Sequence, residues 1–217
     1  MQGGSPLFLP QPERLLQAEP LPQSFFRLPA STLAPMLLGR LLCHEDEAGL
    51  TGGLIVEAEA YAGPADRAAH SYGNRRTPRT EIMYSAGGHA YVFPIYGLYH
   101  CFNVVAAQPG QPEAVLIRAL QPVVGVDAMQ RRRGTQGRPD RLLTSGPGRL
   151  CQALGINRRC NGLPLYDPDS SLRLLPGVSL EPQSVACGPR IGIDYAAEWR
   201  EVPWRFWLAG NPWVSRP

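Results

Sequence analysis

The spacing of apolar and polar residues predicts a chain built largely of strands. Residues 51–61 alternate in polarity, and residues 113–120 form an apolar run interrupted by Arg118, so both are expected to be strands. Further strands are expected near residues 171–175, 185–193 and 203–209. The segments between strands are too short for repeated crossover helices, and we therefore expect mainly antiparallel pairing.

Helical periodicity is limited to three segments. The first begins at Ser31-Thr32, which would cap it, and continues to about Cys43. Residues 123–133 predict a second helix, and a third is expected from Ser145 to about Leu154. The high contents of Gly and Pro, 23 each, agree with short elements and many turns. Together these patterns predict one mixed domain of helices and mainly antiparallel strands.

An aromatic segment, Tyr91–Asn103, has five Tyr or Phe residues in thirteen positions. Alternation on both sides of Tyr96-Gly97 predicts a β-hairpin that turns there, and Pro94 places its first strand at a sheet edge. A tyrosine beside a turn glycine suits a wedge that enters a flat apolar layer, such as stacked bases. Three other aromatic residues of the hairpin are expected to pack in the core: Tyr91, Tyr99 and Phe102.

The chain has 217 residues, which fits one domain, and its first 24 residues show no sustained periodicity. We expect residues 1–24 to form a flexible or loosely docked arm and residues 25–217 to form the domain. No apolar run approaches the length of a membrane span, and the first residues lack the basic-then-apolar order of a signal peptide. These features predict a soluble intracellular protein with no membrane partner.

The charged residues narrow the possible chemistry. The net charge is +3, and all 21 basic residues are arginine. Without lysine, no side-chain amine is available to form a Schiff base with a sugar or a carbonyl compound. The five cysteines lack C-x-x-C spacing, which argues against a disulfide framework and against a structural zinc site. We expect neither a metal nor another cofactor.

Glu57, Glu59 and Tyr61 share one face of the first predicted strand, because side chains alternate along a strand. Two neighbouring carboxylates couple their ionisation, and one could act as a general base. A solvated acidic face is the alternative. Arg118 favours a buried site, because a charge in an apolar strand needs a partner and an arginine could hold Glu57 or Glu59. Exposure at a sheet edge is the alternative for Arg118.

His70 and two groups of arginines are further candidates for ligand binding. His70 could present its imidazole to a ligand, or it could be purely structural. The arginines form local positive patches that could contact phosphates, although solvated surface explains them as well. The candidates for phosphate contacts are Arg75, Arg76, Arg79, Arg141 and Arg149.

The order of these segments resembles that of the alkyladenine (3-methyladenine) DNA glycosylase family, from about Ser31 to Ser215. The motifs that carry the resemblance are IVEAEAYAGPADRAAH (Ile55–His70), YVFPIYGLYHCFN (Tyr91–Asn103), VLIRALQP (Val115–Pro122) and SGPGRLCQAL (Ser145–Leu154). Their joint presence is specific, whereas any one alone is not. The resemblance implies an α+β fold: a single mixed domain with a curved, mainly antiparallel β-sheet, surrounding helices and a protruding β-hairpin.

The resemblance also implies roles for three residues in chemistry and DNA distortion. Glu59 matches the general base of the family. Arg118 matches the active-site arginine near the attacking water and the lesion phosphate. Tyr96 matches the tyrosine that inserts into the DNA.

Four more residues match the family's base pocket. Tyr61 and His70 match residues that sandwich and recognise the flipped base, and Asn103 matches the residue that disfavours the 2-amino group of guanine. Phe93 falls where better-known members can carry a tyrosine. Its ring still stacks, but any hydrogen bond from that hydroxyl is lost, so the lesion preference stays open.

The implied function is base-excision repair. The enzyme would flip alkylated or deaminated purines out of double-stranded DNA and hydrolyse the N-glycosidic bond with a water activated by Glu59. Because the chain lacks lysine, we expect a monofunctional glycosylase that leaves an abasic site and has no lyase activity. We expect a monomer, cytoplasmic and nucleoid-associated in a bacterium or nuclear in a eukaryote. Two alternatives stay open: a non-catalytic binder of distorted DNA or RNA, and a glycosidase acting on free nucleosides or sugars.

Overall fold

The computed structural model describes residue 7, residues 12–137 and residues 140–216. Its strands are β1 (Leu41–Asp46), β2 (Gly49–Tyr61), β3 (Ala90–Ile95), β4 (Tyr99–Ala106), β5 (Glu113–Val124), β6 (Leu172–Leu175), β7 (Val185–Gly188) and β8 (Arg205–Leu208). They form one sheet in the order β3-β4-β5-β2-β1-β6, and β8 joins it by pairing with both β2 and β7. The described pairings are all antiparallel, so the predicted α+β fold class is confirmed.

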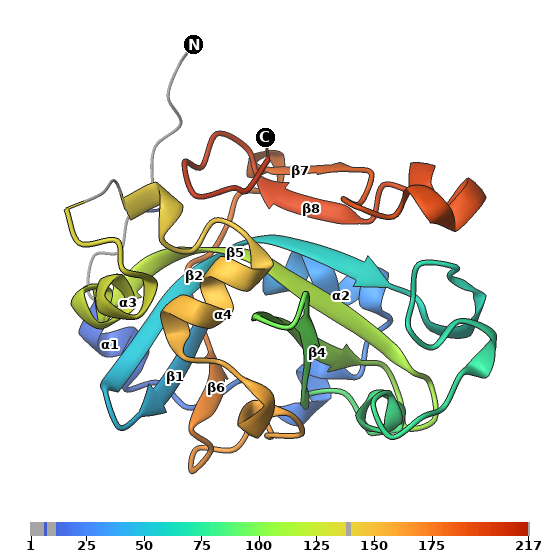
Figure 1. Cartoon of the computed structure of the whole chain (residues 1–217), viewed down its shortest axis with the longest axis horizontal. Coiled ribbons are helices and arrows are strands. Elements are labelled where there is room, and N and C mark those ends of the chain that lie inside the picture. Colours follow the sequence, from blue (N-terminus) through green and yellow to red (C-terminus); the bar gives the residue numbers. More distant parts are fainter. Residues whose placement is uncertain (1–6, 8–11, 138–139, 217) are drawn as a thin grey trace.

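The α-helices among the described residues are α1 (Pro12–Leu16), α2 (Ala30–Leu37), α3 (Val126–Arg133) and α4 (Pro147–Leu154). The second and third predicted helices are confirmed as α3 and α4. Helix α2 packs against β2 and β5, and α4 packs against β4 and β5. Figure 1 shows the β7–β8 pair lying above β2 and β5, with the C-terminal end of the chain beside it. This pair therefore approaches the middle of β2, where the acidic residues lie.

The first predicted helix is wrong in its C-terminal half. Helix α2 ends at Leu37, and Leu41 already begins β1. Gly39 has a positive φ of 75° and breaks the helix, and β1 then pairs along its whole length with β2. The predicted cap is also wrong, because the helix begins one residue before Ser31, where a carboxylate oxygen of Glu113 accepts the Ala30 amide at 2.7 Å.

Strand β2 is the centre of the sheet and carries a bulge in its middle. Its register against β5 shifts between Ile55 and Ala58, which breaks the simple alternation of side chains. Ile55 and Val56 therefore both enter the main core, although they are neighbours in sequence. Glu57 and Glu59 lie on the side where β8 also pairs with β2. The bulged strand thus buries a hydrophobic core and two carboxylates together.

The aromatic segment forms the predicted hairpin, with β3 at the edge of the sheet, where the missing N–H of Pro94 is tolerated. Tyr91 and Phe102 are buried as expected. Tyr99 was expected in the core, but it is 43% exposed. It lies at the start of β4 near the turn, where it rests against Gly148 of α4 instead of entering the core.

Part of the expected N-terminal arm lies outside the described residues, which omit positions 1–6 and 8–11. Leu7 lies against the sheet, where its amide donates to the side-chain oxygen of Gln121 at 2.7 Å and its carbonyl accepts from the same side chain at 2.8 Å. Further along, the Leu21 amide donates to the Leu174 carbonyl of β6.

None of the helices among the described residues has the length and apolar character needed to cross a bilayer. Within the same residues, no three His, Cys, Asp or Glu side chains come together as a metal-binding group.

Candidate active site

Arg118 joins the two carboxylates of β2. Its Nε lies 2.9 Å from a carboxylate oxygen of Glu57, and its Nη1 lies 3.2 Å from Glu59. Both glutamates are fully buried and Arg118 is nearly so. The predicted pairing is confirmed, and both alternatives, a solvated acidic face and an exposed edge arginine, are excluded. Two negative charges and one positive charge this close in the interior need a further cation, which Arg205 of β8 supplies beside Glu57.

Glu59 is surrounded by hydrogen-bond donors. Its Oε1 accepts the Ile191 amide at 2.8 Å as well as facing Arg118, and its Oε2 accepts the Tyr61 hydroxyl at 3.0 Å. Burial raises the pKa of Glu59 and the nearby Glu57 adds to the rise, whereas the three donors oppose it. A carboxylate with a raised pKa is a stronger base than a free one. Among the described residues Oε2 has a single hydrogen-bond donor, so this oxygen keeps a lone pair that could accept a further hydrogen bond.

Tyr61 is a fixed donor to this carboxylate. Burial and the nearby Glu59 hold the pKa of Tyr61 well above its usual value, so the hydroxyl stays protonated. Tyr61 ends β2 and also lines the adjoining cavity with its ring. One residue therefore connects the buried carboxylate to the wall of the cavity.

Glu57 anchors the other end of Arg118 and ties in the C-terminal segment. Its Oε1 also accepts from Nη1 of Arg205 on β8, at 3.2 Å, and its Oε2 accepts the Ser215 amide at 2.7 Å. The guanidinium of Arg118 thus has one fixed orientation, which directs Nη1 to Glu59. The positioning role of Ser215 had no signal in the local sequence pattern.

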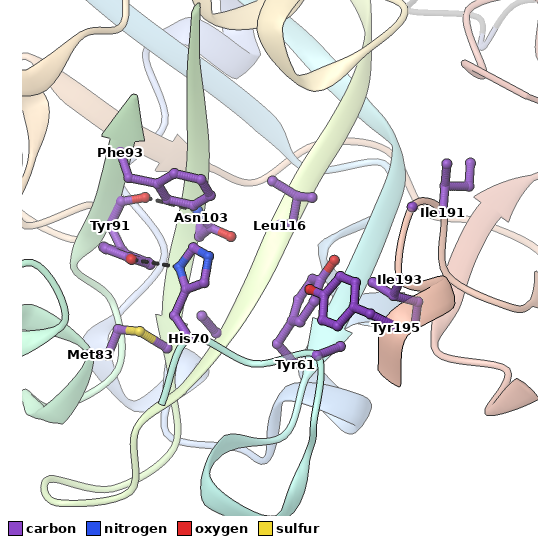
Figure 2. Close-up of a pocket in the computed structure, with 13 residues that line it drawn as sticks. Tyr61, His70, Met83, Tyr91, Phe93, Asn103, Leu116, Ile191, Ile193 and Tyr195 are labelled. Carbon is purple, nitrogen blue, oxygen red and sulfur yellow. Dashed lines mark hydrogen bonds between the residues drawn. The ribbon is translucent and has the colours of Figure 1, made fainter. Parts of the chain in front are cut away.

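A cavity of about 110 Å3 opens beside Tyr61. Figure 2 shows Tyr91, Phe93 and His70 on one side of it, facing Tyr61 and Tyr195 on the other. Its lining also includes Ala68, Met83, Asn103, Ala114, Leu116, Ile191, Gly192 and Ile193. Aromatic rings on opposite walls, with His70 and Asn103 among them, suit a planar ligand that carries hydrogen-bonding groups.

His70 is oriented by Tyr91 behind it. Its Nδ1 lies 2.8 Å from the Tyr91 hydroxyl, so Nε2 is left to face the cavity. The His70 ring is partly exposed to solvent. Loss of water around the rest of the ring disfavours its protonated form, and the positive charges of Arg79 and Arg75 add to this, so the pKa of His70 falls to about 4. His70 is therefore neutral near pH 7. Tyr91, expected only to pack, holds His70 in place through its hydroxyl.

Asn103 and Phe93 complete this wall. The Asn103 side-chain amide donates to the Tyr91 carbonyl at 3.1 Å across the hairpin, which fixes its orientation. The Phe93 ring lies 4.6 Å from the His70 ring in an edge arrangement. The four residues predicted for a base pocket therefore line one cavity: Tyr61, His70, Phe93 and Asn103.

The opposite wall is held by an ion pair that the sequence patterns did not reveal. Arg190 and Asp66 are both fully enclosed, with Nη2 of the arginine 2.9 Å from the carboxylate. The guanidinium also stacks on the Tyr61 ring, 4.8 Å from its centroid. Because Ile191 follows directly in sequence, this pair sets the position of the amide that binds Glu59.

Tyr96 lies apart from the cavity, at the turn of the hairpin. It adopts a positive φ of 49°, which a tyrosine rarely does, and is 91% exposed. Leu98, in the same turn, is 82% exposed. The turn therefore presents two large apolar side chains to solvent, and Leu98 was missed by the sequence interpretation.

The five arginines predicted to contact phosphate lie in two places. Arg75, Arg76 and Arg79 are exposed around the turn after Tyr72–Asn74. Arg76 is already held by Glu81 through two contacts of 2.9 and 2.6 Å. Arg141 and Arg149 line a separate groove of about 380 Å3, which also includes Ser215.

The fold and the site define a class of protein: an α+β domain with a cavity between aromatic walls, next to a buried carboxylate whose pKa is raised. A profile of the methylpurine-DNA glycosylase family matches residues 24–212. Two similar proteins bear the name "Putative 3-methyladenine DNA glycosylase". One, from Bacillus cereus strain G9842, is 48% identical over 202 residues, which cover 90% of this chain and 98% of the relative. The other, from Bacillus licheniformis, is 50% identical over 198 residues, 91% of this chain and 97% of the relative.

This protein belongs to the methylpurine-DNA glycosylase family. The resemblance inferred from the sequence motifs is thereby confirmed.

Proposed function

We propose that this protein is a DNA-3-methyladenine glycosylase of base-excision repair. It removes alkylated or deaminated purines from double-stranded DNA. The observation that carries the proposal is the position of Glu59, buried and hydrogen-bonded to Tyr61 at the wall of an aromatic cavity. A base bound in that cavity brings its sugar toward the carboxylate.

The cavity lies inside the protein surface, so a base in a duplex must rotate out of the stack to enter it. Unstacking costs a few kcal/mol, and least for a poorly paired base. Tyr96 fills the space that the base leaves, and Leu98 is placed to add apolar contact. Stacking of the extruded base on Tyr61 and on the His70–Phe93 wall offsets the cost at roughly 1–3 kcal/mol per stacked base.

Hydrolysis uses the free position on Oε2 of Glu59. A water held there attacks C1′ of the sugar, a C1′–O bond forms, the C1′–N bond breaks, and the carboxylate takes the proton. The negative charge of Glu59 also stabilises the oxocarbenium character of the sugar. Arg118 keeps the carboxylate in place and lies near the expected position of the lesion phosphate.

The charge of the departing base determines whether it must be protonated before it leaves. A base alkylated at N3 or N7 is already cationic and leaves without an acid, whereas hypoxanthine or ethenoadenine needs protonation. Asn103, fixed by the Tyr91 carbonyl, disfavours the 2-amino group of guanine. His70 is neutral and so offers either a donor or an acceptor at Nε2, depending on its tautomer.

The reaction ends at the abasic site. The chain contains no lysine, so no side-chain amine attacks C1′ to start strand cleavage. Four of the arginines predicted to contact phosphate, Arg75, Arg76, Arg141 and Arg149, bind the backbone without reading sequence. The protein acts as a monomer, and its similarity to bacterial proteins supports action in the cytoplasm.

The test is the Glu59→Gln variant, assayed for base release from a duplex with one 7-methylguanine or hypoxanthine. We expect lesion binding to persist and release to fall at least a hundredfold, because general-base catalysis alone contributes about 10²–10⁴-fold. Turnover close to that of the wild type would remove Glu59 from the mechanism.

Two controls in the same assay separate the rival functions. Release from free nucleosides as fast as from duplex DNA would favour a nucleoside glycosidase, and lesion binding with no release by the wild type would favour a non-catalytic binder. Analysis of the product for β-elimination tests the monofunctional assignment, since strand cleavage by pure protein contradicts it.

A further inference from the structure

A second groove, of about 390 Å3, adjoins the base cavity and shares Ala68, His70 and Tyr195 with it. It is the more positive of the two, because its lining includes Arg67, Arg75 and Arg79. Arg67 has a carboxylate partner in Glu198, at 4.0 Å. Within the described ranges, Arg75 and Arg79 take part in no ion pair.

Arg79 lies directly behind the wall of the base cavity. Its guanidinium carbon is 4.7 Å from the centroid of the Phe93 ring. Phe93 lines the base cavity, whereas Arg79 lines only the neighbouring groove. The guanidinium therefore lies outside the cavity, behind Phe93 and near the Tyr91 hydroxyl, and a base stacked on Phe93 has it one ring away.

The other charges around the cavity are compensated. Arg190, which stacks behind Tyr61 on the opposite wall, is paired with Asp66. The two glutamates of β2 are balanced by two arginines, Arg118 and Arg205. His70, whose ring lies beside Phe93 on the same wall, is neutral near pH 7. Arg79 is thus an uncompensated charge placed against the surface that stacks the base.

We propose that Arg79 is a specificity-determining residue that disfavours a cationic, N-alkylated base relative to a neutral lesion base. The inference rests on the proposed function. A cationic base meets like-charge repulsion across Phe93, which a neutral base such as hypoxanthine does not. Because Arg79 is exposed, solvent and salt weaken the repulsion, and we expect an effect of about three- to tenfold.

This role differs from that of a phosphate contact, which was the role predicted for Arg79 from the sequence. A phosphate contact strengthens the binding of every duplex to the same degree, whatever base is in the cavity. A charge behind the stacking ring changes the ratio between cationic and neutral substrates. The two roles therefore give different results for the same substitution.

The experiment measures single-turnover base release from two duplexes that differ only in the lesion, 7-methylguanine or hypoxanthine. The quantity of interest is the ratio of their second-order rate constants. We expect Arg79→Gln to raise the ratio of 7-methylguanine to hypoxanthine about three- to tenfold, and Arg79→Lys, which keeps the charge, to raise it less. Arg14→Gln removes the same charge from α1, outside both cavities, and should leave the ratio unchanged.

The possible results are distinct. A ratio that rises in Arg79→Gln, rises less in Arg79→Lys and is unchanged in Arg14→Gln supports the inference. An equal fall for both lesions would leave Arg79 as a phosphate contact only and overturn it, as would no change for either. Failure of the wild-type protein to release either base would overturn the proposed function itself, and this inference with it.

Discussion

Glu59 combines complete burial with several hydrogen-bond donors. Burial raises its pKa, and Arg118, the Ile191 amide and the Tyr61 hydroxyl limit the rise. The first effect makes the group basic, and the second keeps it ionised and oriented. The sequence pattern identified Glu59 and its partner Arg118, because each places a charged side chain within a predicted strand. It did not identify Ile191, whose contribution is a backbone amide that every residue type provides.

The raised pKa of Glu59 predicts how the rate depends on pH. The base must be ionised to accept a proton, so activity is lost as the pH falls through the pKa of Glu59 in the folded protein. We expect the single-turnover release of 7-methylguanine to rise with pH to a plateau, with its midpoint above the ordinary glutamate value of 4.5. This substrate is already cationic, so no acid is needed to obscure the profile.

Release rates measured from pH 4 to pH 8 would cover this rising limb of the pH profile. His70, with a pKa of about 4, titrates lower. The limb should be absent from any residual activity of Glu59→Gln. A midpoint at or below 4.5 in the wild type would contradict the assignment of a raised pKa to the base.

The β3–β4 hairpin performs two tasks at its two ends. Near the sheet, Tyr91, Phe93 and Asn103 build one wall of the cavity. At the turn, Tyr96 and Leu98 face solvent. Alternation and the turn glycine predict the element and its edge position from local sequence. The contact between Tyr91 and His70 joins residues from different elements and could not be predicted that way.

The hairpin turn gives a prediction about DNA binding. Tyr96→Ser should weaken the affinity for lesion duplex roughly 5–150-fold, corresponding to about 1–3 kcal/mol of lost stacking. Tyr96→Phe keeps the ring and should bind like the wild type. Equilibrium binding by fluorescence anisotropy, with an undamaged duplex beside the lesion duplex, measures both variants. If Tyr96→Ser binds the lesion as tightly as wild type, the turn is not the wedge.

Across the whole molecule, the charged residues fall into two groups, buried ion pairs and exposed arginines. The interior holds compensated pairs, such as Arg190 with Asp66, while exposed arginines without ion-pair partners in the described residues, such as Arg75 and Arg141, lie at grooves. The small net charge of +3 conceals this division. Sequence counting predicted surface patches, but only the fold showed which arginines are already neutralised by a carboxylate.

The exposed arginines predict the salt dependence of binding. Arg75→Gln and Arg141→Gln should each weaken binding to damaged and undamaged duplexes alike and lower the slope of log K against log salt by about one. Arg76→Gln should have a smaller effect, because Glu81 already compensates Arg76. Titrations at several salt concentrations measure the slopes. An unchanged slope for either of the first two variants would remove that arginine from the DNA contacts.

The sequence by itself determined most of the strands, the hairpin with its edge proline, and the acidic strand with its arginine partner, but not β1, whose first residues it placed in the first helix. These features follow from local periodicity and from the cost of burying an unpaired charge. It placed the end of the first helix wrongly, because pairing with β2 outweighed helical periodicity beyond Leu37.

Only the tertiary structure decided how the site closes. The Ile191 amide lies 132 positions after Glu59 in the chain, and the Ser215 amide lies 158 positions after Glu57. Backbone donors carry no signal of identity, and contacts over such separations exist only when β8 and the C-terminal segment pack beside β2. The identity of the charged side chains in the site can therefore be predicted from local sequence, whereas their arrangement depends on the packing of the whole fold.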